Sequence, residues 1–217
     1  MQEMIQTVAI AALPVILAIT LHEAAHGYAA RYFGDPTAWQ EGRITANPLK
    51  HIDPVGTILV PIIILLLSTG GILFGWAKPV PVNFGRLRHP KQDMLWVAAA
   101  GPAANLAMLL FWAMLMKLTV TLPIHFFSVA MARMAEIGIL VNLALMVLNL
   151  FPLPPLDGGR IAVSLLPPKA AWRFAKLEPF GFPILLLLLF TGILSKLLMP
   201  VMSAVMGMIY FIFQFSG

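Results

Sequence analysis

The chain has 217 residues, of which 60% are hydrophobic and only 11% are charged. A soluble domain averages about half apolar and about a quarter charged residues, so the composition excludes an ordinary soluble protein and predicts about five or six membrane segments. The net charge of +5 is typical of membrane-protein loops rather than of a nucleic-acid-binding surface, and the lack of cysteine excludes disulfides and thiolate metal ligands.

The first apolar segment, residues 5–33, contains the sequence His22-Glu23-Ala24-Ala25-His26. Residues four apart lie on one face of a helix, so His22 and His26 can direct two imidazoles at one ion. The H-E-x-x-H pattern is typical of zinc metalloproteases, in which the Glu acts as general base. Ionisable groups inside a membrane helix are costly and usually functional. We therefore expect a metal site rather than a chance pattern on a solvated helix face.

The predicted site lies well below one membrane face. If the first helix continues to Phe33, His22 lies eleven residues before its end, or roughly 16 Å at a rise of about 1.5 Å per residue.

The stretch after the first helix is rich in Gly, Pro and Asn and contains a β-compatible run from Trp39 to Thr45. It predicts a small β-hairpin or an extended loop near the membrane surface. If a substrate binds by strand addition, this run is the candidate edge.

Residues 57–76 are apolar but are interrupted by Pro61 and by Gly70-Gly71. If this segment crosses the membrane, the 14 Lys and Arg residues divide eight against six; if it dips in and returns, they divide eleven against three. The positive-inside rule favours the re-entrant arrangement, with the N-terminus outside and the active site toward the cytosolic side.

Residues 94–117, 132–150 and 181–198 predict three further membrane helices. A fifth apolar segment, 200–214, either turns back as a short helix or lies at the interface. The sequence Gly101-Pro102-Ala103-Ala104-Asn105 is typical of close helix packing through small residues, and Asn105 could bond a neighbouring helix.

A catalytic zinc takes three protein ligands, so the two histidines need a third. Asp157 is the preferred candidate. Three prolines at 152, 154 and 155 end the preceding helix, and Gly158-Gly159 allow a sharp turn that directs the carboxylate. An isolated Asp after an apolar run is costly unless it is paired, protonated or bound to metal. The alternatives are that Asp157 caps a helix starting near Ile161, or that Glu41 in the polar loop is the ligand.

Together these motifs resemble the site-2 protease family of intramembrane zinc metalloproteases, in its compact branch without PDZ or CBS domains. The resemblance rests on residues 22–26, 101–105, 149–155 and 157–158 and on the stretches NPLKHIDPVGT and FGWAKPVPVN. It implies that His22, His26 and Asp157 hold one Zn²⁺ per chain and that Glu23 is the catalytic base. It also implies that Asn105 and Asn149 contact the substrate backbone or the transition state.

The expected fold is an all-α polytopic membrane protein with a short β-hairpin or re-entrant region after the first helix. We expect one transmembrane metalloprotease domain over residues 1–217. Its expected parts are a metal-binding helix (5–33), the hairpin and re-entrant region (36–92), core helices (94–153), an Asp-Gly loop (154–160) and C-terminal membrane segments (181–215).

The expected function is hydrolysis of peptide bonds within or near transmembrane segments, in a bacterial-type cell membrane. The expected partners are transmembrane protein substrates and the lipid bilayer, with no nucleic acid; a homo-oligomer or a regulatory partner in trans stays open. One alternative is a divalent-metal or proton transporter that uses the buried His, Glu and Asp groups. The other is an inactive scaffold that binds helices.

Overall fold

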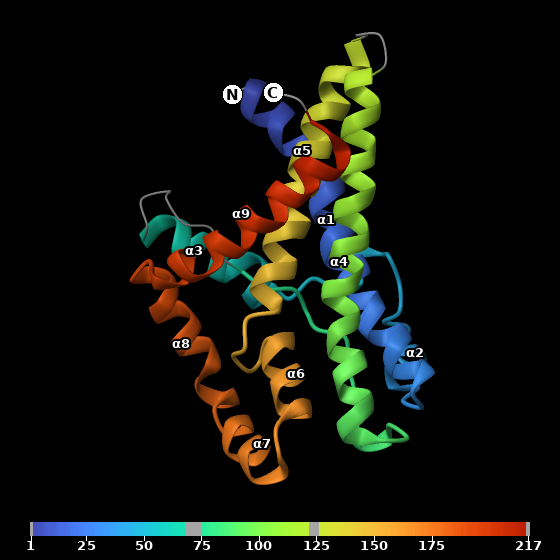
Figure 1. The fold of residues 1–217 in the computed structure, drawn as a ribbon, viewed down its shortest axis with the longest axis vertical. Coiled ribbons are helices and arrows are strands. Elements are labelled where there is room, and N and C mark those ends of the chain that lie inside the picture. The colour runs from blue at the N-terminus through green and yellow to red at the C-terminus, as the bar shows by residue number, and fades with distance from the viewer. Residues whose placement is uncertain (1, 68–74, 122–125, 216–217) are drawn as a thin grey trace.

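The computed structural model describes residues 2–67, 75–121 and 126–215, and all regular structure in this part of the chain is helical. The long helices are α1 (Gln2–Tyr32), α4 (Pro90–Thr121), α5 (Phe126–Asn149) and α9 (Ile193–Phe213). The short ones are α2 (Thr37–Gln40), η1 (Pro48–Lys50), η2 (Pro54–Leu59), α3 (Val60–Leu67), η3 (Phe84–Arg86), α6 (Asp157–Leu165), α7 (Pro168–Ala175) and α8 (Glu178–Phe190). The predicted all-α fold is confirmed (Figure 1).

Four of the described helices are long and apolar enough to cross a membrane. They cover Gln6–Tyr32, Pro90–Thr119, Val129–Asn149 and Ile193–Phe213. A helix satisfies all its backbone hydrogen bonds internally, which is why such apolar segments fold this way in lipid. The prediction of an integral membrane protein agrees with these helices, but the predicted five or six spans reduce to four candidates in the described part of the chain.

The predicted bounds of the C-terminal membrane segments were wrong, because the break between the two helices lies near residue 192 and not near residue 199. The predicted span 181–198 is interrupted at Gly192, whose φ of +72° is a left-handed conformation that glycine adopts at helix ends. The preceding α8 has 13 residues, about 20 Å at a rise of about 1.5 Å per residue, which is too short for a hydrocarbon core of about 30 Å. Pro200, expected to separate two segments, lies inside the continuous helix α9.

The predicted β-hairpin at Trp39–Thr45 was also wrong, since the described residues there form no strand. The buried Asp35 accepts hydrogen bonds from the backbone N–H of Thr37 and of Asn83, and this starts the helical turn α2. Gly42, at φ +61°, follows α2 and leads into irregular chain. The alternative of an extended loop agrees better with the structure.

The chain between α1 and α4 starts and ends at the same end of the bundle. Arg88 donates a backbone hydrogen bond of 3.0 Å to Phe33 O, which joins the end of α1 to the start of α4. Within this segment, Trp76 N–H donates to Gly56 O and Lys78 N–H donates to His51 O. The entry and exit of the predicted re-entrant segment therefore lie side by side, although residues 68–74, with Gly70-Gly71, lie outside the described part.

Helices α1, α4 and α5 pack together as the centre of the bundle, with α4 antiparallel to the other two (Figure 1). The largest buried cluster joins α4, α5 and α9 through Leu109, Trp112, Ala113, Ala135, Ile139, Leu143, Met146, Val147 and Ile209. In this cluster the ring of Trp112 lies directly over Gly138, where a Cβ atom would overlap the indole. Gly138 thus lets α4 and α5 approach closely.

We expect the substitution Gly138→Ala to destabilise the bundle, because the added methyl group overlaps Trp112. Overpacking of this kind costs about 1–3 kcal/mol, and each kcal/mol lowers the unfolding midpoint by roughly 2–4 °C in a chain of this size. Thermal unfolding of the purified protein in detergent would measure the change. Gly207→Ala is the matched control, because a Cβ at Gly207 meets no atom within 4 Å; equal midpoints for both variants would contradict the prediction.

Candidate metal centre

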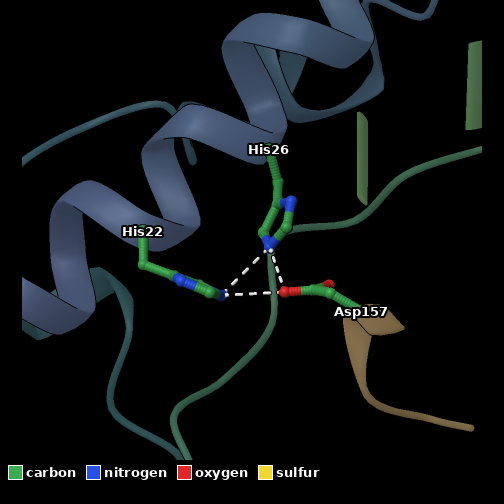
Figure 2. A group of neighbouring side chains, drawn as sticks. All are labelled: His22, His26 and Asp157. Carbon is green, nitrogen blue, oxygen red and sulfur yellow. Dashed lines mark hydrogen bonds and ion pairs between the residues drawn. The ribbon is translucent and has the colours of Figure 1, made fainter. Parts of the chain in front are cut away.

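Two parts of the chain that are far apart in sequence supply the site. His22, Glu23 and His26 lie on α1, and Asp157 is the first residue of α6. The spacing of four residues places both imidazoles on one face of α1, as the sequence predicted. Figure 2 shows the two rings and the Asp157 carboxylate directed at one point.

The start of α6 holds Asp157 in place through two glycines. A Cβ at Gly158 would overlap the backbone of Leu150 and Phe151, and one at Gly159 would overlap the backbone of Leu153 and Pro154. The expected sharp turn was wrong: both glycines belong to the first turn of α6 and neither has a positive φ. They are needed because the helix lies against its own preceding loop.

The alternative in which Asp157 caps a later helix is also excluded by this geometry. The helix begins at Asp157 itself, and the capping position belongs to Leu156, which makes no side-chain cap. Glu41, the other candidate ligand, is exposed at the end of α2 and lies outside the group formed by His22, His26 and Asp157.

Three potential ligand atoms form a nearly equilateral triangle. His22 Nε2 and His26 Nε2 are 3.1 Å apart, and each lies 3.3 Å from Asp157 Oδ2. Four-coordinate zinc with bonds of about 2.0–2.1 Å places its tetrahedral ligands about 3.3–3.4 Å apart. The three separations thus fit three corners of such a site.

The outer nitrogen of each imidazole fixes its protonation state. His22 Nδ1 lies 2.6 Å from Asn105 Oδ1, and His26 Nδ1 lies 2.7 Å from the backbone oxygen of Val97. The other hydrogen bonds of Asn105 orient its amide so that Oδ1 faces His22, and both partners are therefore oxygen acceptors. Each Nδ1 then carries the proton, and each Nε2 presents a lone pair. Oxygen partners on the outer nitrogen are typical of metal-binding histidines.

The three inner atoms therefore face one another without a hydrogen between them. Asp157 Oδ2 is buried and makes no hydrogen bond, although both Nε2 atoms are near. Three lone-pair atoms at this distance repel unless a cation lies between them, so the donor set fits a divalent metal ion.

Glu23 is held at one carboxylate oxygen. Its Oε2 accepts a hydrogen bond of 2.7 Å from the backbone N–H of Val80, in the irregular segment 75–83. Pro79 and Pro81 have no N–H, so Val80 is the donor that this short stretch can offer. Within the described part of the chain, Oε1 has no hydrogen-bond partner.

Asn105 contacts the metal-site residue His22. It is fully buried, its Nδ2 donates to Ala18 O and to Asn142 Oδ1, and its Oδ1 faces His22 Nδ1. Both amide donors are thus used inside the protein, which agrees with the alternative of a bond between helices; the substrate contact of Asn105 stays a prediction. Asn149 is half-buried, and its Nδ2 donates to Leu145 O within α5.

Asn142 and Gly101 are two contributors that the sequence analysis did not assign. Asn142 is fully buried, donates to Gly138 O and accepts from Asn105; an isolated Asn in an apolar helix was the available signal. A Cβ at Gly101 would overlap both imidazoles, since His22 Cε1 and His26 Cε1 lie 2.6 Å from that position. The glycine of the 101–105 motif therefore makes room for the histidines.

The fold and site define an integral membrane protein with a buried centre of two histidines and one carboxylate on an H-E-x-x-H helix. The chain is 39% identical over 195 residues to "Putative zinc metalloprotease YwhC" of Bacillus subtilis, covering 88% of this chain and 85% of that protein. It is 33% identical over 205 residues to "Putative zinc metalloprotease Rip2" of Mycolicibacterium smegmatis and 30% identical to the Rip2 protein of Mycobacterium tuberculosis. Both alignments cover 93% of this chain and 72% of the relative. The chain belongs to this zinc metalloprotease family.

No family model and no solved structure matches the chain.

We expect Asn105→Ala to weaken zinc binding about 10–100-fold, the usual effect of removing an outer partner of a metal-binding histidine. Without Asn105 Oδ1, the His22 ring loses the acceptor that fixes its proton on Nδ1. Competition with a chelator for zinc would measure the affinity. Asn149→Ala is the control, because the hydrogen bond that this amide makes to the described residues lies within α5; an equal loss in both variants would contradict the assigned role of Asn105.

Proposed function

We propose that the chain is an intramembrane zinc metallo-endopeptidase of the site-2 protease type. The observation that supports this most is the depth of the centre on a helix long enough to cross a membrane. His22 lies ten residues before the end of α1 at Tyr32, or about 15 Å along the helix axis. A protease centre at that depth suits substrates that are themselves membrane segments.

His22, His26 and Asp157 would hold one zinc ion per chain, as the three-ligand set of a catalytic site requires. The ion would supply Lewis acidity, which acidifies water and polarises the scissile carbonyl. The imidazoles contribute neutral ligands because Asn105 and Val97 hold their protons on Nδ1.

Glu23 is the proposed general base, next to the ligand His22 on α1. It takes a proton from the attacking water as the carbon–oxygen bond forms, and delivers this proton to the amine when the carbon–nitrogen bond breaks. Its Oε2 is held by Val80 N–H, so Oε1 is the oxygen proposed for this transfer. The peptide and one water together give a carboxylic acid and an amine.

Asn149 remains the proposed substrate-contacting residue. It is the last residue of α5, half-buried, and its Oδ1 has no hydrogen bond to the described residues. An unwound substrate exposes backbone N–H groups, and such an oxygen can accept a hydrogen bond from one of them. The proposed substrates are transmembrane proteins, and the cytosolic orientation of the site remains a prediction from the Lys and Arg distribution.

We expect Glu23→Gln to abolish cleavage of a single-span membrane protein while zinc content stays at the wild-type level, because the amide cannot accept the proton and is not a ligand. Product release after co-reconstitution with a set of single-span proteins, together with elemental analysis, would measure both. Glu136→Gln makes the same change at an exposed position on α5 and should keep wild-type cleavage.

The same experiment separates the protease from the transporter and the scaffold. Zinc-dependent uptake without cleavage in the wild type would favour a transporter, and bound zinc with neither activity would favour a scaffold. Unchanged cleavage by Glu23→Gln would remove Glu23 from the chemistry.

A further inference from the structure

Helix α7 carries a basic face that the metal centre does not use. Lys169, Arg173 and Lys176 are exposed, and Trp172 among them is 63% exposed. Their positions i, i+3, i+4 and i+7 place the four side chains on one side of the helix. Residues 158–177 contain four basic residues and no acidic one, and Glu178 follows directly.

A surface depression of about 460 Å³ lies on this face and is lined by Pro168, Lys169, Trp172 and Arg173. Within the described chain neither Lys169 nor Arg173 has a hydrogen bond or an ion pair. By contrast, Lys176 lies 3.3 Å over the Trp172 ring, in a second depression that also includes Glu178. Like charges at i and i+4 repel, so an anion between Lys169 and Arg173 is favourable.

The depression lies at the end of a candidate membrane span. Lys91, in the first turn of α4, donates a hydrogen bond of 2.6 Å to Leu166 O, immediately before α7. The span in α4 begins at Pro90, and Figure 1 shows α7 and the start of α4 at the same end of the molecule. Helix α7 therefore lies where lipid headgroups are, and Trp, Lys and Arg are favoured there.

We propose that the depression between Lys169, Trp172 and Arg173 binds the phosphate of an anionic phospholipid. The two cations supply charge and hydrogen-bond donors, and the guanidinium of Arg173 suits a phosphate in particular. The indole of Trp172 offers an apolar contact to the glycerol and upper acyl region. The charge of the site selects phosphatidylglycerol over the neutral phosphatidylcholine.

The test uses the full chain in uncharged detergent micelles, titrated with phosphatidylglycerol or phosphatidylcholine while thermal unfolding is followed. A ligand that binds the folded state raises the unfolding midpoint, so phosphatidylglycerol should raise it and phosphatidylcholine should not. The double variant Lys169→Gln/Arg173→Gln should bind phosphatidylglycerol roughly 30-fold more weakly, given the usual contribution of a cation near a lipid surface. The control Arg133→Gln/Lys196→Gln removes the same charge at exposed positions on α5 and α9 and should respond like the wild type.

Equal responses to both lipids, or an unchanged response of the double variant, would overturn the proposal. Free glycerol phosphate is tested in parallel. If it raises the midpoint as much as the lipid does, the site recognises phosphate alone and no lipid is required.

Arg43 is a buried cation that has no carboxylate partner among the described residues. It is 7% exposed, and the ion pairs among the described residues involve other side chains. Its Nη2 instead donates to the backbone oxygens of Lys78 and Pro79, at 3.0 and 3.1 Å. A buried charge paired only with carbonyls is costly, so its position calls for a role.

The Pro79 carbonyl and the Val80 N–H belong to the same peptide group. Arg43 donates to the oxygen of this peptide, and its N–H donates to Glu23 Oε2 at 2.7 Å. The peptide dipole is thus aligned between a cation and a carboxylate, an arrangement in which each hydrogen bond strengthens the other.

Close packing brings this chain of contacts against α1. Gly27 lies one turn after Glu23, and a Cβ there would lie 2.8 Å from Ile44 Cγ1 and 3.2 Å from Val80 Cγ1. The absence of that side chain lets the residue after Arg43 and the donor Val80 both reach the helix. The loop is therefore connected to Glu23 by contact as well as by charge.

We infer that Arg43 is a positioning residue that fixes the 79–80 peptide and, through it, the carboxylate of Glu23. This inference rests on the proposed role of Glu23 as general base. Arg43 would then affect the chemical step without holding the metal.

The test compares Arg43→Met, Arg43→Lys and the control Arg31→Met in cleavage assays with the full chain. Arg43→Met should lower kcat roughly 10–100-fold, as displacement of a catalytic group does, with KM and zinc content unchanged. Arg43→Lys keeps a donor for the two carbonyls and should recover part of the loss. Arg31 is exposed over the Trp39 ring and its variant should keep wild-type kcat.

Glu23→Asp separates this inference from the proposed function. The shorter side chain should not span to Val80, so adding Arg43→Met to it should cause little further loss, a non-additive result. Loss of zinc, an altered KM alone or an unchanged kcat in Arg43→Met would overturn the inference. If Glu23→Gln itself cleaves normally, the proposed function fails first.

Discussion

The three ligand atoms of the centre repel one another, and a cation bound between them would remove this repulsion. Two imidazole nitrogens and one carboxylate oxygen lie 3.1–3.3 Å apart, and the protons that could separate them are held on the outer side of each ring by Asn105 and Val97. In an apolar bundle this arrangement is costly without a positive charge at its middle. The surrounding contacts are therefore best understood as those that keep these three atoms together.

Most of these contacts come from a different helix than the group they hold. The amide of Asn105 on α4 faces His22 on α1, and Asn142 on α5 accepts a hydrogen bond from Asn105. Glycines allow the approach: Gly101 makes room for the imidazoles, and Gly158 and Gly159 let α6 lie on the loop before it. A buried polar network is stable only when each member has its hydrogen-bond partners. The amides reach their partners because the small residues let the helices approach closely.

The membrane setting explains both the successful and the failed parts of the prediction from sequence. Long apolar runs predicted α1, α4 and α5 because a helix is the only spanning structure open to them. Hydropathy did not locate the helix break at Gly192, and it did not show that α9 continues through Pro200. Hydropathy measures how apolar a segment is, and this does not determine where one helix ends and the next begins. The hairpin at Trp39–Thr45 failed because Asp35 starts a helical turn through contacts that include Asn83, far along the chain.

The sequence by itself determined the chemical groups of the centre: the spacing of His22 and His26 fixes one helical face, and Asp157 is an isolated carboxylate in an apolar context. Only the tertiary structure decided which atoms meet, that Asn105 is used up inside the protein, and that Asn142 and Gly101 belong to the site. The physical reason is that local spacing is a property of one helix, whereas hydrogen-bond partners and close approaches arise between helices and depend on how these pack.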